Sequence, residues 1–274
     1  MYPLFARTLG KLLLTLYAII ILLPLLVVVM ATMKDQQQFY MNPIGVPSSF
    51  SLDNYIHLFQ SQPMLMYFSN SVIVSFSTVA VLLVLASMIS FGLYRLKNKI
   101  SQTILLLFVI GLMVPSQVNM IPIHSFLRDL GLTNSRIGLI LVSVSVLMPL
   151  SVFMINGFMK SLPREVFESA SIDGAGESRM YLQIAMPLSV PYLAATATFL
   201  FVSVWNELLF PLLLITDQSK MTLPLALLQF QGEYSTNYPG LLSGVVIISL
   251  PMLVMFLFLQ RFFISGVTAG SLKG

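Results

Sequence analysis

The stretch LLLTLYAIIILLPLLVVVMATM, from Leu12 to Met33, holds 22 residues without one charged side chain. A helix of about 20 apolar residues is long enough to cross the hydrocarbon core of a bilayer. The whole chain of 274 residues shares this character, because 57% of it is hydrophobic and only 9% is charged. Soluble domains carry roughly 25% charged residues. The sequence therefore predicts a membrane protein.

Five further apolar runs are also long enough to cross. Strands of a membrane barrel would be about 10 residues of alternating character, and these runs are longer and not alternating. Backbone groups in lipid must be satisfied within their own segment, which leaves the helix. We therefore expect an all-α membrane protein with six transmembrane helices, at about 12–33, 69–94, 103–123, 137–159, 188–215 and 241–260.

The first run could also be read as a secretory signal peptide. The apolar region of a signal peptide is about 7 to 15 residues long and ends at a small-residue cleavage site. This run is longer, and Thr32-Met33-Lys34 makes a poor site. We expect an uncleaved first span.

The basic residues predict the orientation. Of the 14 Lys and Arg residues, four lie on one side of the predicted membrane and the rest on the other. Cytoplasmic loops carry the excess of Lys and Arg, so both termini are expected in the cytoplasm. The net charge of +4 then reflects topology, and we expect no nucleic-acid partner. The four outer residues are Lys34, Arg128, Arg136 and Lys220.

Catalytic patterns are absent from the sequence. It has no cysteine, which excludes disulfides and thiolate metal sites. Its two histidines, His57 and His124, fall in predicted outer loops, and no zinc motif or phosphate-binding glycine loop occurs. We expect a non-enzymatic chain without a cofactor of its own. Any nucleotide chemistry would belong to another subunit.

A polar island interrupts the apolar sequence between Lys160 and Pro187. Pro163 suits the first turn of a helix, with Ser161 as its cap, and the pattern predicts a short helix over 164–172. Gly174 supplies a turn, and a second short helix is expected over about 177–185. The result is a slim cytoplasmic elbow, which either fits a cleft on a partner or is an ordinary surface loop.

Two polar residues in the fifth run allow two interpretations. An acidic residue within a span is costly and normally faces protein or water. Asn206 and Glu207 could line an outer cavity, or Glu207 could be a hydrogen-bonded structural residue. Pro115, Pro122 and Pro149 could kink their helices so that these line the translocation path. Alternatively, the helices could be kinked but sealed.

The island carries the resemblance to a known family. The chain resembles the sugar-type permease subunits of bacterial ABC importers, the family of the maltose-transporter inner-membrane proteins. Their hallmark is Glu-Ala-Ala, three residues, Gly, nine residues, Ile, any residue, Leu-Pro. Ser169 and Met186 depart from it and keep size or apolarity. The residues that this resemblance implicates in ATPase coupling are Glu168, Ser169, Ala170, Asp173, Gly174, Ile184 and Pro187.

The resemblance extends along nearly the whole chain. Trp205-Asn206-Glu207, Thr222-Leu223-Pro224 and Gln231-Gly232-Glu233-Tyr234 look like this family, as does the ending from Gly266 to Gly274. It implies one permease domain over 1–274 in the bacterial inner membrane, with a coupling segment at about 161–187.

The resemblance also implies partners. They are a second permease of a different sequence, two ATPase subunits that hold ATP and magnesium, and an extracytoplasmic sugar-binding protein. The implied cargo is a carbohydrate, an oligosaccharide in particular. The alternative is a polyol or a sugar phosphate such as glycerol-3-phosphate. An intramembrane enzyme and a passive channel are the rival classes.

Overall fold

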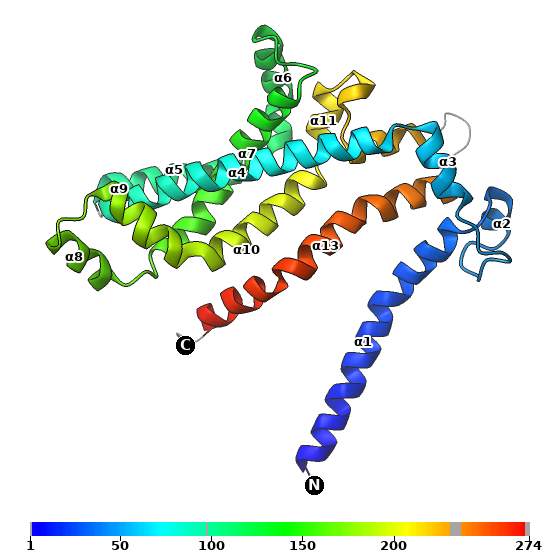
Figure 1. Ribbon diagram of the computed structural model, residues 1–274, viewed down its shortest axis with the longest axis horizontal. Coiled ribbons are helices and arrows are strands. Elements are labelled where there is room, and N and C mark those ends of the chain that lie inside the picture. The colour runs from blue at the N-terminus through cyan, green and yellow to red at the C-terminus, as the bar shows by residue number, and fades with distance from the viewer. Residues whose placement is uncertain (1, 97, 231–236, 272–274) are drawn as a thin grey trace. The chain divides into compact units, whose positions relative to one another are not determined.

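The computed structural model describes residues 2–96, 98–230 and 237–271, and every regular element in these ranges is helical (Figure 1). The long helices are α1 (Tyr2–Thr32), α4 (Met64–Leu96), α5 (Lys99–Met113), α7 (Arg136–Met159), α10 (Met186–Trp205) and α13 (Tyr238–Ser271). The short elements are α2 (Gln36–Met41), α3 (Asp53–Ser61), η1 (Ser116–Asn119), α6 (Met120–Asp129), α8 (Arg164–Ile172), α9 (Glu177–Met180), η2 (Tyr181–Ala185), α11 (Leu209–Leu214), η3 (Gln218–Lys220), α12 (Leu223–Leu227) and η4 (Leu228–Phe230).

Among the described residues, five helical stretches are long and apolar enough to cross a membrane. A sixth span results if α5 and the η1–α6 stretch, bent by 87° at a short break, count as one. The all-α membrane fold predicted from the sequence is therefore confirmed. The five stretches are Thr8–Thr32, Met64–Leu96, Arg136–Met159, Glu177–Trp205 and Tyr238–Phe258.

The third run, expected as one span over 103–123 that Pro115 and Pro122 could kink, is interrupted in the structure. Helix α5 ends at Met113, and Val114 and Pro115 are extended, with ψ of 114° and 128°. A proline disfavours the helical conformation of the residue before it, so Pro115 explains why the helix stops there. Pro122 lies in the first turn of α6, where its missing N–H costs nothing.

The fifth run also differs from the expected 188–215. Helix α10 ends at Trp205, and a separate short helix, α11, begins at Leu209. At its other end α10 continues α9 through η2, so the apolar stretch runs from Glu177 to Trp205. The span therefore begins inside the polar island and ends before Glu207.

The chain divides into two compact units, one of residues 1–65 and 226–250 and the other of 66–225 and 251–274. In the first unit, polar contacts hold the carboxyl-terminal end of α1. Lys34 is buried, and its Nζ donates to the carbonyls of Asn42 at 2.7 Å and Pro43 at 3.2 Å. The Asn54 amide donates to the carbonyls of Thr32 and Lys34, both at 2.8 Å. These bonds satisfy carbonyls that a helix end leaves without intrahelical partners.

Helix α7 is central in the second unit, where it packs against α5, α10 and α11. Small side chains allow close approach, as is usual between membrane helices. Gly111 on α5 faces Pro149 on α7, and a Cβ at Gly111 would lie 3.3 Å from the proline ring. The island with α8 and α9 lies at one end of this unit, and α6 and α11 lie at the other (Figure 1).

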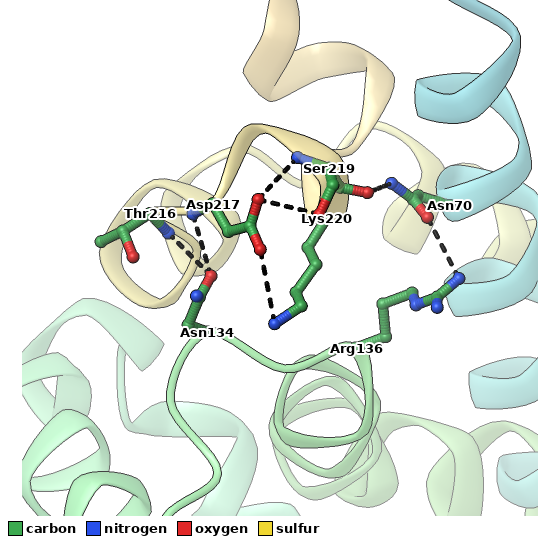
Figure 2. A network of polar contacts seen from close by, with 7 residues as sticks. All are labelled: Asn70, Asn134, Arg136, Thr216, Asp217, Ser219 and Lys220. Carbon is green, nitrogen blue, oxygen red and sulfur yellow. Dashed lines mark hydrogen bonds and ion pairs between the residues drawn. The ribbon is translucent and has the colours of Figure 1, made fainter. Parts of the chain in front are cut away.

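A network of polar contacts joins α4, α7 and the η3 loop at the end opposite the island (Figure 2). The Asn70 amide donates to the carbonyls of Ser219 and Met221, both at 2.9 Å, and Asn70 accepts from Arg136 at 3.2 Å. Hydrogen bonds from the Ser219 hydroxyl and N–H, together with the nearby Lys220, hold the pKa of Asp217 below its usual value. These contacts fix the start of α7.

Asn134 lies at the other side of the same network. It has a positive φ of 53°, a conformation that asparagine tolerates better than most residues. Its N–H donates to the carbonyl of Leu214, and its Oδ1 accepts from the N–H groups of Thr216 and Asp217 (Figure 2). The side chain thereby satisfies backbone groups that follow α11.

Candidate functional site

The island forms two helical arms, α8 and α9, joined by a turn, and we call residues 161–180 the elbow. Helix α8 covers Arg164–Ile172, the range that the sequence predicts. Pro163 precedes the first helical residue and fixes the entry of the chain with φ of −61°. Ser161 does not cap the helix as expected, because its hydroxyl donates to the carbonyl of Phe158 at 2.7 Å. It finishes α7 instead.

Gly174 ends α8 in a left-handed conformation, with φ of 78°. Its N–H donates to Ser171 at 3.1 Å, and the N–H of Ala175 donates to Ala170 at 2.9 Å. This pair of bonds is the Schellman arrangement, which satisfies the last carbonyls of a helix and strongly favours glycine. The turn predicted at Gly174 thus has a defined backbone geometry.

The inner face of the elbow is anchored in a core at the ends of α4, α7 and α10. Phe167 is 1% exposed, and its ring centroid lies 5.4 Å from that of Tyr94 and 6.2 Å from that of Phe91. Burial of one such side chain stabilises by about 1.5–3 kcal/mol. The other buried members of the core are Ala86, Leu93, Val152, Ile155, Met159, Leu162, Met180, Ala185 and Leu193.

The residues predicted for coupling fall into separate groups. Glu168, Ser169 and Asp173 are exposed on the elbow. Ala170 and Ile184 are half-buried and pack against the core. Gly174 makes the turn, and Pro187 is exposed in the first turn of α10.

The sequence analysis missed one exposed apolar residue of the elbow. Ile172, the last residue of α8, is 86% exposed beside the Gly174 turn. The available signal was its place in the last turn of the predicted helix, two residues before Gly174 and next to the charged Asp173. A solvated aliphatic tip between Glu168 and Asp173 is suited to contact another protein.

A π-helical segment, η2, joins the elbow to α10. The N–H of Met186 donates to the carbonyl of Tyr181, five residues earlier. In a regular α-helix, Pro187 would have no N–H to donate to the carbonyl of Gln183, and its ring would clash with that carbonyl. The wider π turn avoids this conflict, and π segments are frequent at functional sites. Tyr181 also bonds Ser87 of α4, with the two hydroxyl oxygens 2.7 Å apart.

Glu207 lies in the break between α10 and α11. Its Oε1 accepts from the N–H groups of Leu209 at 2.8 Å and Phe210 at 3.3 Å, so it caps α11. It also lines two small cavities, of about 10 and 50 Å³. The smaller has room for about one water molecule. Exposed Asn206 donates to the carbonyl of Val202 at 2.9 Å and to the sulfur of Met252 at 3.4 Å.

No three His, Asp or Glu side chains in residues 2–96, 98–230 and 237–271 lie close enough together to hold a metal ion. The arrangement is instead a set of membrane helices with a rigid, solvent-exposed elbow. These features define the class: a multi-pass membrane protein with a helical connection outside its spans.

The comparisons agree with this class. The fold matches a solved bacterial ABC transporter that imports alginate, with a TM-score of 0.81 over 94% of this chain and 96% of that one, at 16% identity. Residues 4–268 match the family "Binding-protein-dependent transport system inner membrane component", and the chain belongs to this family.

Curated relatives are permease subunits of similar length. One is a probable ABC transporter permease of Bacillus subtilis, 32% identical over 94% of this chain and 86% of its own length. A diacetylchitobiose uptake permease of Streptomyces coelicolor is 32% identical over 95% and 87%. An arabinooligosaccharide permease of Halalkalibacterium halodurans is 33% identical over 94% and 93%. The chain is thus a non-catalytic, multi-pass inner-membrane subunit of an ABC transporter, and ATP hydrolysis belongs to a separate subunit.

Proposed function

We propose that this chain is the permease subunit of an ATP-driven importer for a carbohydrate, an oligosaccharide in particular. The support is the range of named cargoes among its relatives. These include diacetylchitobiose, arabinooligosaccharides, melibiose, raffinose and stachyose, and trehalose and maltose. None of these named cargoes is a sugar phosphate such as glycerol-3-phosphate.

The proposed assembly has this chain, over its whole length of 1–274, as one permease domain. A second permease completes the path, two ATPase subunits hold ATP and magnesium, and an extracytoplasmic binding protein delivers the sugar. A solved alginate transporter has been crystallised with its oligosaccharide-bound periplasmic protein, which supports the last partner. The termini and the elbow would face the cytoplasm.

The elbow is the observation that carries the ATP-driven part of the proposal. Its inner face is fixed by buried Phe167, whereas Glu168, Asp173 and the 86% exposed Ile172 point away from the core. An element that is packed on one face and exposed on the other can transmit a movement of a partner to the helices that it packs against. A movement of the elbow would be transmitted directly to α10, because α9, η2 and α10 follow one another without a loop.

The roles within the elbow follow from this geometry. Ile172 would enter an apolar cleft of the ATPase, and the Glu168 carboxylate would accept a charge-assisted hydrogen bond at its rim. Gly174 would hold the tip at the required angle. Ser169, Ala170, Ile184 and Pro187 would shape the arms and their junction with α10.

The test is to assemble the complex with Ile172→Ser and Glu168→Ala and to measure two quantities. We expect less ATPase retained on the purified complex and less oligosaccharide uptake by cells, with normal amounts of permease in the membrane. Asp129→Ala is the matched control, since it removes an exposed carboxylate at the opposite end of the second unit. Full retention and uptake by both elbow variants would refute this role.

The cargo is tested separately. The cognate binding protein is titrated with a panel of oligosaccharides, polyols and sugar phosphates, and the ligand found is then offered to proteoliposomes that contain the whole complex. Uptake that requires ATP supports an importer. Equal flux without ATP would indicate a passive channel.

A further inference from the structure

Helix α3 belongs to the first unit, and hydrogen bonds attach it to the carboxyl-terminal end of α1 (Figure 1). The Asn54 amide donates to the carbonyls of Thr32 and Lys34. The Tyr55 hydroxyl donates to the hydroxyl of Thr32 at 2.9 Å. Thr32 is the last residue of the apolar stretch that begins at Thr8. These bonds therefore hold the first turn of α3 at the depth where a membrane span ends.

The second turn of α3 lies against α13. Leu58 is the buried residue of α3, and a Cβ at Gly244 would lie 3.6 Å from its Cδ1. Gly244 is six residues into α13, which is about 9 Å along a helix that begins at Tyr238. The stretch from Tyr238 to Phe258 is apolar enough to cross a membrane. Leu58 is therefore level with the first two turns of a second span.

A cluster of aromatic side chains in the same unit marks the same boundary. The ring of Phe39 stacks on that of Tyr238, with 5.6 Å between the centroids, and Tyr40 meets Tyr238 edge-on at 6.1 Å. Tyrosine is enriched where a bilayer meets water, because its ring is apolar and its hydroxyl is polar. The start of α13 thus lies at a membrane surface, with α3 beside it.

The exposed surface of α3 is divided along its length into two flanks. One is apolar and consists of residues that are 49–58% exposed: Leu52, Ile56 and Phe59. The other is polar and also exposed: Asp53, His57 and Gln60. In each flank the residues are four and then three positions apart, so they share one side of the helix. A helix at the boundary of lipid and water meets both solvents, and α3 offers a flank suited to each.

We propose that α3 is an interfacial helix, whose apolar flank inserts among the lipids of the adjacent leaflet while its polar flank contacts water. Helices with two such flanks lie in the plane of the membrane surface. Residues 50–62 contain no Lys or Arg, so burial of apolar surface drives this contact, and attraction to anionic headgroups does not. The apolar stretch of α1, to which α3 is bonded, is likewise exposed along its length.

The contact with lipid goes beyond the transport function and depends only on the chain lying in a membrane. It would hold the ends of two helices at the membrane surface. Helix α3 is bonded to the end of α1, and only Gln62 and Pro63 separate it from the start of α4.

The test uses the absence of cysteine from the chain. Single cysteines replace the six flank residues one at a time in the full-length protein, purified with the subunits that accompany it. Each cysteine is spin-labelled in phosphatidylcholine liposomes. Electron paramagnetic resonance then measures its collisions with oxygen, which concentrates in lipid, and with a nickel chelate, which stays in water. Ile56→Cys and His57→Cys are the matched pair, because the two residues are neighbours and both are exposed.

We expect the ratio of oxygen to nickel collisions to be higher at each position of the apolar flank than at its neighbour on the polar flank. The ratios at the apolar flank should correspond to a depth of about 5–10 Å into the boundary of headgroups and acyl chains. Low rates with both reagents at the apolar flank would show that another protein covers it, and this would overturn the proposal. Equally high nickel rates on both flanks would place the whole helix in water and would also overturn it.

Discussion

Arg95 and Glu177 lie 82 positions apart in the sequence and form a bidentate pair in the structure. The Nη2 of Arg95 lies 2.8 Å from Oε1 of Glu177, and the Nε of Arg95 lies 3.0 Å from Oε2. Arg95 lies in the last turn of α4, next to Tyr94, which packs on Phe167 of α8. The two arms of the elbow are therefore both attached to the same turn of α4.

Glu177→Gln should loosen the second arm without unfolding the protein. The pair is partly exposed, with 26% and 62% of its side chains accessible, so its coupling energy should be at most about 1 kcal/mol. Thermal unfolding of both single variants and the double variant in detergent gives this energy. The charge-swapped Arg95→Glu with Glu177→Arg should recover part of the loss. Strictly additive effects would show that the pair contributes nothing.

Gly174→Ala should destabilise the elbow, whereas Gly176→Ala should not. Both glycines have open space for a Cβ, but only Gly174 has a positive φ. A side chain in that conformation costs about 1–2 kcal/mol. Hydrogen exchange of the α8 amides measures the difference, and Gly176 is the matched control. Equal protection in the two variants would show that the turn does not depend on the left-handed glycine.

Local signals in the elbow could be predicted because they act within a few residues. Proline before a helix and glycine after it gave α8 its bounds, Arg164–Ile172. The apolar runs likewise predicted an all-helical membrane protein, and five stretches qualify as spans, or six if the bent α5 and η1–α6 pair counts as one. Breaks in the middle of a run were harder, because hydropathy does not change there. The bend at Pro115 and the end of α10 at Trp205 depend on backbone geometry.

Long-range contacts could not be predicted from one sequence. Nothing in the local pattern assigns Arg95 to Glu177 or Tyr181 to Ser87. The role of Glu207 as a cap was left open for the same reason, since it required knowing that α11 begins at Leu209. The η2 segment could be anticipated only from Pro187, whose missing donor disturbs the preceding turn.

Replacement of Glu207 distinguishes a residue that lines the transport path from a structural residue that caps α11. Glu207→Ala removes the acceptor for Leu209 and Phe210 and should cost about 0.5–2 kcal/mol, as loss of a helix cap does. Glu207→Gln keeps an amide oxygen and should remain close to wild type in thermal stability. If uptake also survives in Glu207→Gln, the residue is structural. A stable Gln variant without uptake would assign its charge to the transport path.

The topology can be mapped without background labelling, because the chain contains no cysteine. Asp129→Cys at the end of α6 should react with a membrane-impermeant maleimide in intact spheroplasts. Ser178→Cys on α9 should react only after the membrane is opened. Both positions are exposed in the folded chain, so access depends on the side of the membrane. The opposite pattern would invert the proposed orientation.

Asn134 should stabilise the end of the second unit opposite the elbow. Asn134→Ala leaves the N–H groups of Thr216 and Asp217 without their acceptor and places alanine at a positive φ. Each lost hydrogen bond costs about 1 kcal/mol. Asn134→Asp keeps the acceptor and should lose much less in a thermal unfolding experiment. Equal midpoints for Ala and Asp would contradict the capping role.

The π turn at Tyr181–Ala185 also sets the angle by which the elbow is rotated about the axis of α10. A π turn holds one residue more than the α turn it replaces, and each residue in an α-helix advances the chain by about 100° around the axis. Deletion of one residue there would let the helix become regular and would swing the elbow by roughly that angle relative to α10. The extra residue therefore sets the rotation of the elbow about the axis of the fifth span, and with it the side of that span on which the exposed Ile172 lies.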